Sequence, residues 1–82
     1  MNEIRVLFFA TLKDRAGTRE TTVRLSDSAP VRDLKLLLIE RFPGLQEAIP
    51  SALVAVNHEF AFDEDTIPTG AEVALFPPVS GG

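Results

Sequence analysis

The residues best suited to chemistry lie in the last segment of the chain, the run FPPVSGG from Phe76 to Gly82. Pro77 and Pro78 lack the N–H donors that a strand needs and favour polyproline geometry, so we expect them to end a strand and project the chain outward. Gly81 and Gly82 have no side chains, which leaves the carboxylate of Gly82 unhindered for attack on the α-phosphate of ATP to give an acyl-adenylate. Residues 77–82, extended over roughly 20 Å, would carry this group into another protein's active site.

The rest of the chain offers little else for catalysis. His58 is the only histidine, and a single imidazole supplies neither a multi-ligand metal site nor a general base with a nucleophile beside it. The acidic run at residues 63–65 lacks the glycine and the distant glutamate of a calcium loop, so both features are expected to be turns. There is no cysteine, hence no thiolate ligand or nucleophile. We therefore predict no metal site, no permanently bound cofactor, and no catalysis by this chain alone.

Length and charge limit the classes of function. The 82 residues carry 8 basic and 12 acidic side chains, a net charge of -4, and the length fits one domain over residues 1–82 with 77–82 as its tail. No basic residue follows Arg41, so a surface that tracks phosphates is hard to build and nucleic acid is not an expected partner. The chain has no apolar run of the roughly 20 residues that span a bilayer and no cysteine pairs, so we expect no membrane association and a cytoplasmic location.

The elements that must position the tail are predicted from periodicity. Apolar runs and alternating patterns predict five strands, at residues 4–9, 21–25, 53–56, 60–62 and 72–76. Apolar residues spaced by three and four predict one helix, starting with Pro30 as its first residue and ending at Pro43. Between the first two strands, residues 10–20 are expected to form a solvated connection with about one helical turn. This order predicts an α+β fold of the β-grasp type, a mixed five-stranded sheet on one main helix with the first and last strands side by side.

Alternation also predicts which side chains face away from the helix. On the first and last strands these are Arg5, Leu7, Phe9, Glu72, Ala74 and Phe76. Phe9 and Phe76 then point outward from adjacent strands, and Phe60 on the fourth strand would extend them. The result is an exposed apolar patch of the kind that marks interaction sites.

Several segments along the whole chain carry a family resemblance: VLFFA at residues 6–10, Gly17, AVN at 55–57, and residues 70–82, where FPPVSGG follows EVAL. Together they resemble the small, sulfur-carrying subunit of molybdopterin synthase, the ubiquitin-like MoaD family. A Gly-Gly end alone is shared with thiamine-pathway carriers and ubiquitin-like modifiers, whereas the longer ending is much more characteristic. Ala71 stands where members commonly have an acidic residue, at a turn with no chemical role.

The resemblance implies a cycle of chemistry at Gly82. A ubiquitin-activating-like adenylyltransferase would use ATP to adenylate it, and a sulfurtransferase system would convert it to a thiocarboxylate. The thiocarboxylate would give its sulfur to cyclic pyranopterin monophosphate, and two deliveries would form the dithiolene of molybdopterin in molybdenum cofactor biosynthesis.

The resemblance also implies partners. The chain would pair with the large synthase subunit as a heterotetramer, two of each, and act as its sulfur donor without being the catalyst. Phe9, Phe60 and Phe76 match positions of the apolar docking surface. The tail, namely Pro77, Pro78, Val79, Ser80 and Gly81 before Gly82, would enter the large subunit's active site.

Three alternatives remain open from the sequence. A ubiquitin-like modifier would end in an isopeptide bond to a target lysine, after the same adenylation. A sulfur carrier for thiamine or an amino acid would differ only in its partners. A noncovalent interaction module would use the Phe9, Phe60 and Phe76 patch and would not need Gly81 and Gly82.

Overall fold

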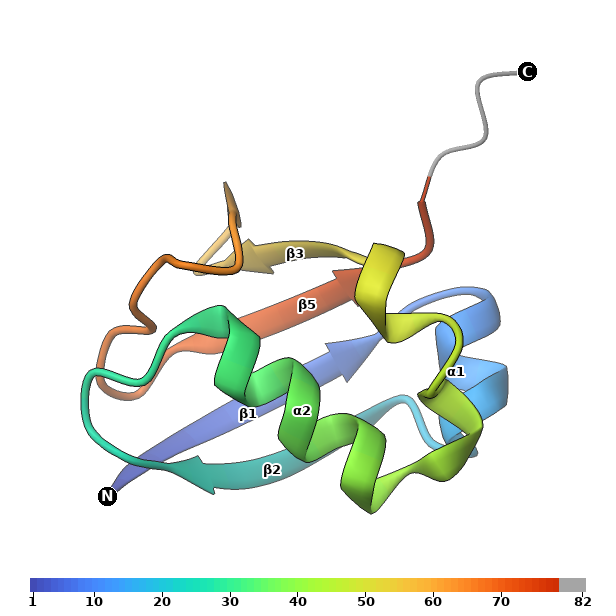
Figure 1. Cartoon of the computed structure of the whole chain (residues 1–82), viewed down its shortest axis with the longest axis horizontal. Helices are drawn as coiled ribbons and strands as arrows, with labels where there is room; N and C mark the ends of the chain where they lie inside the picture. Colours follow the sequence, from blue (N-terminus) through green and yellow to red (C-terminus); the bar gives the residue numbers. More distant parts are fainter. Residues whose placement is uncertain (79–82) are drawn as a thin grey trace.

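The chain folds into a five-stranded sheet with its main helix across one face (Figure 1). The computed structural model describes residues 1–78. The strands are β1 (Asn2–Phe8), β2 (Glu20–Leu25), β3 (Leu53–Val56), β4 (Glu59–Ala61) and β5 (Glu72–Phe76), arranged in the order β2-β1-β5-β3-β4. β1 and β5 pair in parallel and the other neighbours are antiparallel. The predicted mixed β-grasp sheet, with its first and last strands adjacent, is confirmed.

The core lies between the sheet and α2 (Val31–Arg41). α2 buries Val31, Leu34 and Leu38 at the predicted three- and four-residue spacing. The sheet contributes the alternate side chains of its inner face, namely Ile4, Val6, Phe8, Val23, Val54, Val73 and Leu75. The predicted division of β1 and β5 into inner and outer faces is therefore correct.

The start of α2 differs from the prediction. Pro30 has an extended backbone (φ -79°, ψ 164°) and precedes the helix as its cap, so it is not the first helical residue. No side chain caps this end. Instead, the main-chain carbonyls of Asp65 and Asp63 accept hydrogen bonds from the amides of Val31 and Arg32, each at 2.9 Å. A loop about 30 residues further along the chain thus satisfies donors that the sequence around the helix leaves unpaired.

The connection between β1 and β2 is more ordered than predicted. It contains the helix α1 (Thr11–Ala16), which ends where Gly17 adopts a left-handed conformation (φ 77°) and donates to the carbonyl of Lys13 at 3.0 Å. Leu12 is fully buried, so the segment is anchored in the core and is not simply solvated. After α2, two 3-10 turns, η1 (Pro43–Leu45) and η2 (Ile49–Ser51), lead to β3.

Strand bounds shift in three strands, one of them β2, which begins at Glu20, one residue earlier than predicted. β1 begins at Asn2 and ends at Phe8, two residues earlier and one residue earlier than predicted, and β4 covers Glu59–Ala61 where residues 60–62 were predicted. Phe62 follows β4 in a turn, where its amide and carbonyl form hydrogen bonds with Asp65 and not with a neighbouring strand. Among the residues that the structure describes, no helix is long and apolar enough to cross a membrane.

Candidate functional site

The outer face of the sheet carries an apolar hollow of about 340 Å³. Its floor is formed by Leu7 of β1, Ala74 of β5 and Ala55 of β3, which lie opposite one another in the strand register. The two alanines are small, and their larger neighbours Phe76 and Phe60 stand beside them as walls. We call this the outer-face hollow. Its floor residues Leu7, Ala55 and Ala74 had not been predicted as site residues, because the hollow depends on the register of three strands.

Three phenylalanines surround the hollow, as the alternation pattern predicts. Phe9 and Phe76 are stacked, with ring centroids 4.7 Å apart and an angle of 13° between the planes, and Phe9 remains 41% exposed. Phe60 is 76% exposed. Stacking holds two of the rings in fixed positions, so the surface is preorganised for a partner. Their role in docking stays a prediction.

A row of charged side chains borders the hollow. The Nε of Arg5 lies 3.0 Å from an oxygen of Glu20, its Nη1 lies 3.3 Å from Glu72, and the Nε2 of His58 lies 3.5 Å from the other oxygen of Glu72. The hydrogen bond from Arg5 and then its charge lower the pKa of Glu20, and the same contact raises the pKa of Arg5. His58 lies in the predicted turn, between β3 and β4, with a left-handed backbone (φ 73°). It lies at the rim of the outer-face hollow, where Glu72 is its ion-pair partner.

A second apolar groove lies where the tail leaves the sheet. Ala10, Leu53, Phe60, Phe76 and Pro77 line a volume of about 390 Å³, which we call the tail-root groove. It shares Phe60 and Phe76 with the outer-face hollow, so the two surfaces are continuous. Every side chain in this groove is apolar, so it suits an apolar side chain of another protein.

The remaining predicted site residues lie further along the tail. Pro77 is partly buried in the groove and Pro78 is exposed. Val79, Ser80, Gly81 and Gly82 lie outside the described residues. Within residues 1–78, no three His, Cys, Asp or Glu side chains lie close enough together to hold a metal ion.

The β-grasp sheet and its apolar outer face define the ubiquitin-like class of proteins, and comparison with known proteins narrows that class. The profile of the ThiS family matches residues 6–82, so the chain belongs to the ThiS family. The molybdopterin synthase sulfur carrier subunit of Chlamydomonas reinhardtii is 37% identical over 82 residues, covering 98% of this chain and 99% of that protein. The resemblance found in the sequence is thereby confirmed over the whole length.

Two solved structures bear on the fold and its uses. Small archaeal modifier protein 1 of Haloferax volcanii is 29% identical, with a TM-score of 0.86 over 96% of this chain and 100% of that one. A complex of subunits 1 and 2 of molybdopterin-converting factor from Helicobacter pylori contains a chain with a TM-score of 0.68, covering 98% of this chain and 99% of that one. At 20% identity the second likeness shows the fold alone.

Proposed function

We propose that this chain is the sulfur carrier subunit of a molybdopterin synthase. Membership of the ThiS family and full-length similarity to sulfur carrier subunits support this assignment. The observation that carries it is the placement of the two apolar surfaces beside the root of the FPPVSGG segment. A protein that covers Phe60 and Phe76 is already in position to receive the residues that follow Pro77.

The proposed chemistry takes place at Gly82, taken as the last residue. An oxygen of its carboxylate attacks the α-phosphorus of ATP on an adenylyltransferase, and pyrophosphate leaves. A sulfur nucleophile at the oxidation level of sulfide, delivered by a sulfurtransferase, then attacks the carbonyl carbon and displaces AMP, which leaves a thiocarboxylate. Transfer of that sulfur to cyclic pyranopterin monophosphate, with water restoring the carboxylate, would occur twice to build the dithiolene.

The described residues contribute docking and contain no catalytic centre of their own. The outer-face hollow and the tail-root groove would be covered by the large synthase subunit, with two copies of each chain in the assembly and the tail in the large subunit's active site. ATP would be consumed by the activating enzyme, so this chain needs no bound cofactor. We expect the cycle to take place in the cytoplasm.

Mass spectrometry of the C-terminal peptide tests the proposal. The protein is purified from its own cells during active cofactor synthesis and treated with a thiol-alkylating reagent. We expect the peptide ending at Gly82 to be alkylated, because the sulfur of a thiocarboxylate reacts with thiol-alkylating reagents far faster than a carboxylate oxygen does. The peptide is required because oxidation of Met1, the only methionine, changes the intact mass by nearly the same amount as replacing oxygen by sulfur. An unmodified carboxylate under these conditions would contradict the proposal.

A second candidate function is protein modification, which the similarity to small archaeal modifier protein 1 favours. The same adenylated Gly82 would then form an isopeptide bond with a lysine of a target. Peptides in which the carbonyl of Gly82 is joined to the side chain of a target lysine would support this function, provided that they are absent when Gly82 is deleted. A carrier for thiamine or an amino acid would show the same thiocarboxylate, and the enzyme that copurifies with the chain would separate it from the main proposal.

A further inference from the structure

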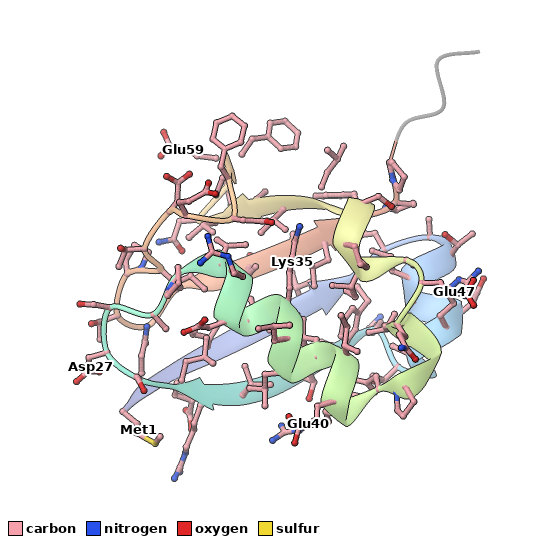
Figure 2. The ribbon with its side chains drawn as sticks, in the orientation of Figure 1. Met1, Asp27, Lys35, Glu40, Glu47 and Glu59 are labelled. Carbon is pink, nitrogen blue, oxygen red and sulfur yellow. The ribbon has the colours of Figure 1, made fainter. Side chains whose placement is uncertain are left out.

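Two exposed phenylalanines flank the free edge of the sheet at β4. Phe60 is 76% exposed and Phe62 is 78% exposed. Phe62 does not line the outer-face hollow or the tail-root groove. It lines a third groove of about 410 Å³, which includes Lys35 and adjoins the other two surfaces at Phe60. Figure 2 shows Glu59 at this edge of the sheet and Lys35 on α2. A single exposed apolar side chain is ordinary, but two aromatic rings beside one groove are the composition of an interaction site.

The turn that presents Phe62 is held firmly. The amide of Phe62 donates to a side-chain oxygen of Asp65 at 2.7 Å, and the amide of Asp65 donates to the carbonyl of Phe62 at 3.0 Å. The carbonyls of Asp63 and Asp65 cap the first turn of α2, as described above. Phe62 is therefore exposed from a fixed backbone, which lowers the entropy lost when a partner binds it.

Carboxylates outnumber cations at this edge. The Nζ of Lys35 lies 2.9 Å from Asp63, with only 10% of its side chain exposed, and Arg32 lies 3.5 Å from Glu64. Residues 59–65 contain four carboxylates, and these two cations of α2 leave an excess of two negative charges. Lys35 is largely buried against Asp63, whereas Arg32 is 53% exposed beside Glu64, so a partner meets a surface on which carboxylates outnumber exposed cations.

We propose that this edge binds a segment of the large subunit in which an apolar side chain is flanked by Lys or Arg. The binding surface, which we call the edge surface, comprises Phe60, Phe62 and Glu64, which line the groove, and Glu59, which precedes Phe60 on β4 at the same edge of the sheet. Charge complementarity selects the basic residues, and Phe60 makes the edge surface continuous with the outer-face hollow, so the protein that covers the hollow also reaches Phe62. The inference rests on the proposed function for the identity of the partner.

Binding of the full chain to the large subunit, measured by calorimetry, tests the edge surface. We expect Phe62→Ser to raise Kd by about tenfold or more, as removal of an anchoring aromatic side chain does. Leu36→Ser is the matched control, because Leu36 is 60% exposed on α2 and does not line the groove, and its Kd should stay within about twofold of the parent value. Thermal unfolding of each variant checks that exposed substitutions leave the fold intact.

Charge is tested with Glu59→Gln and a control, Glu40→Gln on α2. The Glu59 variant should bind about threefold more weakly at low salt and equally at about 1 M salt, where the Debye length is about 3 Å. The Glu40 variant should bind the large subunit with the parent's affinity at both salt concentrations.

The outcomes separate the two proposals. If Phe60→Ser weakens binding and Phe62→Ser does not, the edge surface is overturned while the proposed function stands. If the parent chain does not bind the large subunit, both are overturned. Equal affinity of the Glu59 variant at every salt concentration would overturn the basic character of the partner segment.

Discussion

Ala10 occupies a backbone conformation that normally belongs to glycine. Its φ of 53° and ψ of -130°, with the Leu12 amide donating to the Phe9 carbonyl at 3.1 Å, define a type II′ turn with alanine at the first central position. Such a residue carries about 1–3 kcal/mol of strain. Its methyl group lines the tail-root groove beside Phe76 and Pro77, so the strain accompanies a contact surface.

Ala10→Gly should therefore stabilise the protein. The strain that is relieved is larger than the entropy cost of glycine. We expect the free energy of unfolding, measured in urea, to rise by about 1 kcal/mol. Ala16→Gly makes the same substitution in the last turn of α1, where the backbone is helical, and should cost up to about 1 kcal/mol. A loss of stability in both variants would show that Ala10 is not strained.

The ion pair between Arg5 and Glu20 makes a prediction about pH. Because the pKa of Glu20 is lowered in the folded state, the pair stabilises the protein above the unfolded pKa, and this contribution is lost as the pH falls through the folded pKa. Arg5→Gln should raise the pKa of Glu20 toward its ordinary value, as measured by NMR titration of the side-chain carboxyl. Arg24→Gln, which removes the partner of Glu3 at 3.7 Å, should leave the Glu20 titration unchanged. An unaltered pKa in the Arg5 variant would contradict the assigned cause.

At the scale of elements, Asn2 joins the start of β1 to the loop before β5. Its buried side chain donates to the carbonyl of Pro68 at 3.0 Å and accepts from the amide of Gly70 at 2.8 Å. Asn2→Ala leaves both groups without this partner and should lower the free energy of unfolding by about 2 kcal/mol, measured in urea. The adjacent exposed Glu3→Ala should change it by less than about 0.5 kcal/mol. Equal effects would mean that water replaces the Asn2 side chain without cost.

The ends of the strands show which features of the elements the sequence predicts and which it does not. β3 and β5 begin and end as predicted, because apolar periodicity is a local signal and both strands lie inside the sheet. Asn2 was missed as the start of β1, since its partners are 66 and 68 residues away in the sequence. The cap of α2 by Asp63 and Asp65 was missed for the same reason. Local pattern predicts the elements, whereas long-range main-chain hydrogen bonds decide several of their ends.

For the molecule as a whole, the sequence predicted that phenylalanine rings lie on the outer face of the sheet. It did not predict the hollow beside them. Alternation placed Phe9 and Phe76 together on the outer face, and their stacking confirms it. The hollow beside these rings depends on Ala55 of β3 lying opposite Ala74 of β5, a register that no local pattern specifies. Phe62 was missed because its exposure follows from the turn after β4, where the strand was expected to continue.

The residues up to Phe76 should determine folding, whereas the glycines at the end of the chain should determine the chemistry. The sheet is completed by Phe76, and the buried core extends no further along the described sequence than Leu75. Deletion of Gly81 and Gly82 should leave the thermal midpoint unchanged. Under the proposed function it should reduce ATP–pyrophosphate exchange by the activating enzyme by roughly a hundredfold or more, since misplacing a reacting group by about 1 Å can cost that much.

Two variants complete this test. Ser80→Ala retains both glycines and should keep exchange near the parent rate. Leu75→Ala, at a fully buried position, should lower the free energy of unfolding by about 2–5 kcal/mol while the folded fraction remains a substrate for adenylation. A large loss of stability on deleting the glycines would mean that the fold depends on them. Full exchange activity without Gly82 would exclude its carboxylate as the adenylated group, and the apolar surface would then serve a noncovalent partner.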